Sequence, residues 1–103
     1  MTNEEKKAIL QKLKSSNTTS EEAYYETLCI IGDEKTDYYL YMITAPIDCN
    51  EELKRLPDAD YDLCCALLTM LLREDHFNNG SFVERYNNGQ VQPILERMIE
   101  LLD

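Results

Sequence analysis

The sequence predicts an all-α fold, a compact bundle of five or six short helices around a central buried helix at residues 59–77. Apolar residues recur at helical spacing, and residues that cap helices stand at the segment ends. The chain also contains only three glycines and three prolines. With 103 residues, 44% of them hydrophobic, we expect one acidic helical domain, 1–103, with a single core.

The first expected helix covers residues 3–14. Asn3 is a suitable cap, glutamates stand in the first turn and lysines in the last, which complements the helix dipole at both ends. After a polar loop, Thr19 and Glu22 have capping-box spacing, and Gly32 is typical of the residue that follows a helix. These signals favour a second helix that ends before Gly32.

Residues 23–44 allow two interpretations. Tyrosine, isoleucine, threonine and cysteine favour strands, so residues 26–31 and 38–44 could pair as a hairpin and give an α+β fold. The capping signals favour helices instead, and no third strand is evident to support a hairpin. We expect helices and keep the hairpin as the alternative.

A short helix is expected at 48–56, capped by Asp48 or Asn50 and ended by Pro57. The long central helix follows, with Asp58 or Asp60 as its cap. Its apolar face is wide, which predicts burial on more than one side. The residues of this face are Tyr61, Cys64, Cys65, Leu67, Leu68, Leu71 and Leu72.

Two further helices complete the bundle. Ser81 and Glu84 have capping-box spacing, and Asn88 with Gly89 gives a helix end. The last helix is expected to begin at Pro93, which is favoured in the first helical turn.

The charge distribution limits the classes of partner. The chain has twenty acidic and ten basic residues, a net charge of −10, and residues 15–62 alone hold twelve acids against three bases. Such a field repels nucleic acid and anionic lipid, because both are negatively charged. Direct nucleic-acid binding is also unfavoured because contacts to phosphate supply most of that affinity. We therefore expect a basic protein partner, with no direct nucleic acid and no membrane. No apolar export signal is present, so the expected location is cytoplasmic, with reduced cysteines.

Seven tyrosines accompany these acids, and tyrosine is enriched at interaction hot spots. The primary functional hypothesis is a non-catalytic interaction or regulatory module that binds a basic surface, including the nucleic-acid-binding site of another protein by charge mimicry. The candidate interaction residues are Asp33, Glu34, Asp37, Tyr38, Tyr41, Glu51 and Glu52.

Two other function classes remain open. Asp75 and His76 are candidates for acid/base or metal chemistry, but consecutive helical residues point in different directions. No metal-ligand motif, nucleotide-binding motif or cofactor motif is present, so we expect no cofactor. A helix-turn-helix DNA-binding role for 81–88 ranks last, because Arg85 is the only cation in that segment.

The block 59-ADYDLCCALLTMLLREDHFNNGSF-82, followed by Gly89 and 94-ILERM-98, resembles the C-terminal core of a family of short bacterial proteins of unknown function. The pattern is carried by Leu68, Thr69, Arg73, Asp75, Phe77 and Gly80, and it covers roughly the last 45 residues. His76 stands where the family usually has a second arginine. The resemblance implies a helical, cytoplasmic protein of bacterial or phage origin and no assigned activity. It also implies a structural lock, in which Phe77 fills the end of the core while Arg73 holds the turn at Gly80.

Overall fold

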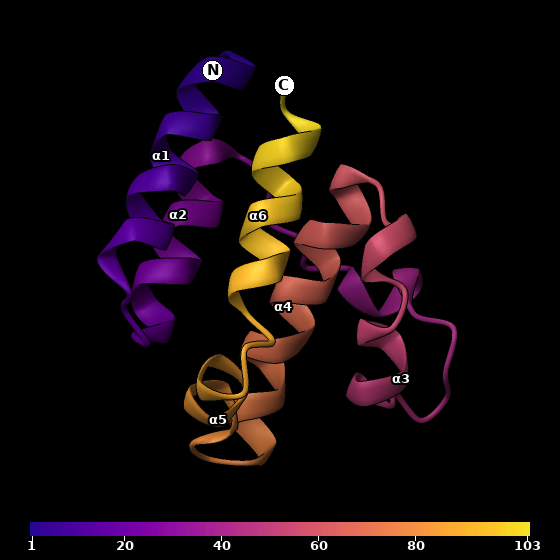
Figure 1. Cartoon of the computed structure of the whole chain (residues 1–103). Helices are drawn as coiled ribbons and strands as arrows, with labels where there is room; N and C mark the ends of the chain where they lie inside the picture. Colours follow the sequence, from indigo (N-terminus) through magenta and orange to yellow (C-terminus); the bar gives the residue numbers. More distant parts are fainter.

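The helix α4 (Tyr61–Phe77) runs through the middle of the molecule, and the other elements pack around it (Figure 1). The computed structural model describes all 103 residues and contains no β-strand. The remaining elements are α1 (Asn3–Ser16), α2 (Glu21–Ile31), the 3₁₀ helix η1 (Tyr38–Tyr41), α3 (Cys49–Leu53), the 3₁₀ helix η2 (Leu56–Asp58), α5 (Ser81–Asn87) and α6 (Gln92–Leu101). The predicted all-α fold is confirmed.

The core forms on both sides of α4, as the wide apolar face predicts. Every residue from Cys64 to Leu72 is buried, which includes Thr69, whose hydroxyl donates to the Cys65 carbonyl oxygen at 2.8 Å. α5, α6, η1 and α3 contact α4 directly, while α1 packs between α2 and α6. Figure 1 shows α6 crossing α4, with the two chain ends at the same end of the bundle. No helix combines the length and the apolar composition that a membrane-spanning helix needs.

The hairpin interpretation of residues 26–31 and 38–44 is wrong. Residues 26–31 belong to α2, which ends at Gly32 with a left-handed φ of 77°. Tyr24, Leu28 and Ile31 are all buried, and their helical spacing decides the structure over the strand preference of single residues. Residues 38–41 form only one 3₁₀ turn, followed by an irregular loop to α3.

The helix starts differ from several expected caps by one residue. Thr2 caps α1 in a capping box with Glu5, in place of Asn3. Asp48 and Asp60, each one of two expected alternatives, cap α3 and α4. Two expected capping boxes do not form, because Ser20 and Gly80 are the residues that precede α2 and α5.

The structure contradicts the expected lock. Phe77 is 91% exposed and is the last residue of α4, one helical turn beyond Arg73. Phe82 fills the core instead, with its ring edge-on to Tyr24 at 4.9 Å between centroids.

The turn between α4 and α5 is held by Asp75 and not by Arg73. The Asp75 carboxylate accepts hydrogen bonds from the backbone N–H groups of Gly80 and Phe82, at 3.0 and 3.1 Å. Gly80 has the expected role in the turn, because its φ of 89° is a left-handed conformation that favours glycine.

Candidate functional site

Ion pairing leaves the protein surface with many unpaired carboxylates. Eight of the ten cations pair with eight different carboxylates, which leaves twelve of the twenty acidic side chains without a cationic partner. The two cations without an ion pair are Lys12, which is exposed, and Arg73, which is partly buried. The outer surface is therefore dominated by negative charge.

Three of the unpaired carboxylates are exposed on α2 or just after its end, and we call Glu22, Glu26 and Glu34 the acidic strip. Glu22 and Glu26 are one helical turn apart, so they share a face of α2. Glu34 and Glu26 both act on the exposed thiol of Cys29, because their charges raise its pKa, with Glu34 as the larger cause. Glu26 and Glu34 therefore both lie close to Cys29.

A groove between α1 and α2 borders this strip. Its volume is about 570 Å³, and its lining includes Leu13, Thr27, Glu26, Ile30 and the exposed, unpaired Lys12. The Ile30 side chain is 61% exposed, although isoleucine is usually buried. Apolar surface beside a row of carboxylates is the composition expected of a protein-binding face.

The seven predicted interaction residues differ in exposure and pairing. Glu34 and Asp37 are exposed, and Glu51 is exposed but pairs with Lys54 at 2.9 Å. Tyr38 is partly buried and lines two of the cavities around α4. Tyr41 is also partly buried, and Lys35 lies over its ring.

Asp33 and Glu52 hold the fold together. Asp33 pairs with Lys6 at 2.9 Å and accepts a hydrogen bond from the Tyr61 hydroxyl at 2.6 Å. The prediction that Glu52 contributes to an interaction surface is therefore wrong, because its side chain has no exposed surface, while the Asp33 carboxylate is engaged by Lys6 and Tyr61.

Glu52 is the most buried acid, with a side-chain exposure of 0%. Its carboxylate accepts hydrogen bonds from the N–H groups of Ile43 and Thr44, from the Thr44 hydroxyl, and from Arg55 at 2.8 Å. Burial acts to raise the pKa of this carboxyl, but the bonds from Thr44, Arg55 and Ile43 prevail and lower it. Glu52 thus fixes the loop before α3 to the helix.

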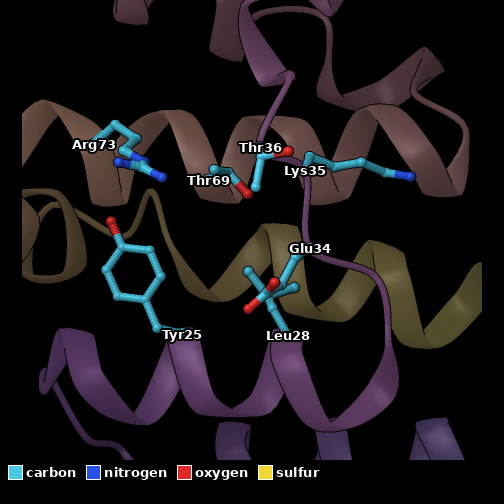
Figure 2. Close-up of a pocket in the computed structure, with 7 residues that line it drawn as sticks. All are labelled: Tyr25, Leu28, Glu34, Lys35, Thr36, Thr69 and Arg73. Carbon is cyan, nitrogen blue, oxygen red and sulfur yellow. The ribbon is translucent and has the colours of Figure 1, made fainter.

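A small polar cavity lies between α2 and α4 (Figure 2), with a volume of about 100 Å³. Arg73 and Thr69 line it from α4, and Tyr25 from α2. The Nε of Arg73 and the hydroxyl of Tyr25 are both buried and have no hydrogen-bond partner within the protein. Sequence reasoning missed this site, since only the fold brings Tyr25 to Arg73.

Asp75 and His76 do not form a shared catalytic site. Asp75 is bonded to the turn, and the hydrogen bonds from Phe82, the largest cause, lower its pKa. His76 is exposed and lies beside Arg73 and Phe77 at a different cavity. Glu21 lies near Asp75, and its pKa is raised by burial and by the neighbouring carboxylate. No group of three histidine, cysteine, aspartate or glutamate side chains is placed to hold a metal ion.

Arg85, the cation considered for DNA binding, is paired with side chains of the protein itself. Arg85 donates to both carboxylate oxygens of Glu74 at 3.0 and 2.8 Å, and also to Asn50 and Gln90. These bonds hold α5 against α4 and α3. Arg85 therefore has little capacity left for phosphate contacts.

Comparison with known proteins assigns the chain to a family. A family of unknown function, DUF6508, matches residues 35–103, about two thirds of the chain. The chain belongs to this family. The DUF6508 match confirms the resemblance of the C-terminal core to a family of unknown function. It also extends that resemblance, which was expected over roughly the last 45 residues, back to residue 35. Searches of curated proteins and of solved structures gave no match.

The acidic strip and the small cavity at Arg73 lie differently with respect to the DUF6508 match. The acidic strip and the groove beside it come from α1, α2 and residue 34, so they lie outside the matched residues. Thr69, Arg73 and Phe77 lie within them and are among the residues that carry the family resemblance. The small cavity therefore joins a DUF6508 element, α4, to an N-terminal element outside the match.

Proposed function

We propose that this DUF6508 member is a non-catalytic interaction module that binds a basic protein surface through the acidic strip. The main support is the partition of charge: twelve carboxylates have no cationic partner, while only two cations remain unpaired. Complementary charge of this kind steers association and selects partners.

The groove between α1 and α2 gives the binding face an apolar centre. Ile30 offers exposed contact area, Leu13 lines the groove as a mostly buried residue, and Glu26 is the strip carboxylate in the lining. An amphipathic helix with lysine or arginine along one edge fits such a groove, because its apolar face is buried while its cations meet the strip. A nucleic-acid-binding protein whose phosphate site the strip would occupy is one partner of this class.

The proposed setting is the cytoplasm. All four cysteines are free, and two of them, Cys64 and Cys65, lie in the core. Reduced thiols are typical of that compartment.

The test uses a short helical peptide with lysine on one face and leucine on the other as the probe. Its affinity for the protein is measured by calorimetry at about 0.01 M and about 0.15 M salt, since the higher concentration screens exposed charges. We expect 1:1 binding that weakens strongly with salt. Affinity that stays constant across this range contradicts the proposal.

Two variants with equal charge change separate a specific face from overall charge. The strip variant carries Glu22→Gln, Glu26→Gln and Glu34→Gln, and the control carries Glu4→Gln, Asp58→Asn and Glu84→Gln. None of these six side chains forms an ion pair with lysine or arginine. The strip variant should lose about tenfold in affinity, from about 0.5 kcal/mol per exposed pair, and the control much less. Equal losses would show that only net charge matters.

A further inference from the structure

Arg73 is the exception in the charge pattern of the protein. The chain has twice as many acids as bases, yet this partly buried guanidinium forms no ion pair, whereas the other three arginines all do. Its Nε is buried without a hydrogen-bond partner in the protein. Buried charges are normally paired, because removing them from water is costly. The unpaired donor marks a site for an anion.

Tyr25 supplies a second donor on the opposite wall. Figure 2 shows its hydroxyl pointing from α2 toward the Arg73 guanidinium, while Glu34 and Lys35 lie at the other end of the cavity. Burial, the largest cause, raises the pKa of Tyr25, so the hydroxyl keeps its proton near neutral pH. Lys35 forms an ion pair with Asp62 at 3.1 Å. Arg73 and Tyr25 are therefore the buried, unpartnered donors of this cavity.

The other side of Arg73 opens onto a groove of mixed lining, in which apolar side chains stand beside polar ones that include Asp48 and Glu74. The volume of this groove is about 790 Å³, and its lining also includes Tyr38, Ile47 and Phe77. The Phe77 ring is 91% exposed. A ligand held at Arg73 therefore has an aromatic and aliphatic surface beside it, on which an apolar group can pack.

We propose that Arg73 and Tyr25 bind the carboxylate of a small acid whose aromatic or branched apolar group packs against Tyr38 and Phe77. A carboxylate suits the site better than phosphate for two reasons. The planar guanidinium matches two carboxylate oxygens, and a singly charged anion is repelled less by a protein of charge −10 with Glu34 at the cavity rim. This site shares Glu34 with the acidic strip but none of its other carboxylates, and it does not depend on the partner proposed above.

N-acetyl-phenylalanine is the probe. Its carboxamide, which lacks the negative charge, is the matched control ligand that should not bind. Binding to the full chain is followed by two-dimensional NMR of the backbone amides. We expect saturable shifts centred on residues 24–28 and 69–77 with the acid, and none with the carboxamide. Absence of saturable shifts with the acid would overturn the proposal, as would equal binding of both ligands.

Single substitutions test which side chains bind the carboxylate of the ligand. Arg73→Gln should lower the affinity at least tenfold, and Tyr25→Phe about fivefold, because each removes donors to the carboxylate. Lys12→Gln removes the other unpaired cation and should leave the affinity unchanged. Glu34→Gln should tighten binding, a change that a folding defect does not produce. Unchanged affinity in both Arg73→Gln and Tyr25→Phe contradicts the site.

Thermal unfolding and small anions complete the test. Because Arg73 has no partner to lose, Arg73→Gln should keep the melting temperature of the free protein, whereas a purely structural arginine would lower it. Acetate should bind more weakly than N-acetyl-phenylalanine, and Phe77→Ala should remove that difference. Inorganic phosphate that binds as well as the aromatic acid would show a general anion site and refute the apolar pocket.

Discussion

At the scale of single residues, Glu51 and Glu52 show what composition cannot reveal. The two acids are adjacent in a short helix, yet Glu51 lies in solvent and Glu52 has no exposed side-chain surface. The donors that satisfy Glu52 come mainly from Ile43 and Thr44, in a loop whose path follows no regular pattern in the sequence. Acidic character alone therefore predicted a surface role for both residues, and only the fold separates them.

Glu52→Ala should destabilise the protein by about 2–4 kcal/mol, because the loop N–H groups and Arg55 lose their acceptor in a buried position. Urea denaturation at neutral pH measures this change. Glu51→Ala is the matched control and should cost no more than about 0.5 kcal/mol, as it removes one exposed pair with Lys54. Similar losses in the two variants would show that Glu52 is not the anchor of the loop.

The same carboxylate gives a pH dependence with a defined sign. The pKa of Glu52 is lower in the folded protein than its ordinary value of 4.5, so its stabilising effect is present above that pH and is lost as pH falls through the folded pKa. The stability difference between the parent and Glu52→Gln should therefore shrink from pH 6 to pH 4. A difference that grows on acidification contradicts the assignment.

At the scale of helices, the period of apolar residues predicted the elements better than the capping residues did. The buried positions of α2 and α6 follow helical spacing, and α4 is buried on all sides from Cys64 to Leu72, as its wide apolar face indicated, so these helices were readable from the sequence. Thr2 caps α1 where Asn3 was expected, since neighbouring polar residues offer similar caps, and Gly80 precedes α5 without a side-chain cap where Ser81 was expected. The burial of Phe82 in place of Phe77 depends on how α5 folds back over α4, which local sequence does not specify.

Phe82→Ala should destabilise the protein by about 3–5 kcal/mol, because it leaves a cavity beside Tyr24. Phe77→Ala should change stability by less than about 0.5 kcal/mol, because the ring is in solvent. Chemical denaturation of both variants compares the two aromatics directly. The reverse order of effects would restore Phe77 as the residue that closes the core.

At the scale of the whole molecule, the sequence predicted the sign of the surface charge but not its placement. Pairs such as Lys6–Asp33 and Lys35–Asp62 join residues that are far apart in the chain, and they remove acids that composition counts as available. What remains unpaired includes the acidic strip, which the i,i+4 spacing of Glu22 and Glu26 could have indicated. The cavity at Arg73 had no such signal, because Tyr25 reaches it from another helix.

The acidic strip as the binding face is the central claim, and mapping the lysine–leucine peptide on the protein by two-dimensional NMR tests it most directly. The account predicts that the backbone amides that shift are those of residues 9–16 and 22–34, around the groove between α1 and α2, and that the strip variant abolishes these shifts. Shifts spread evenly over all six α-helices, or centred on α5 and α6, would contradict it.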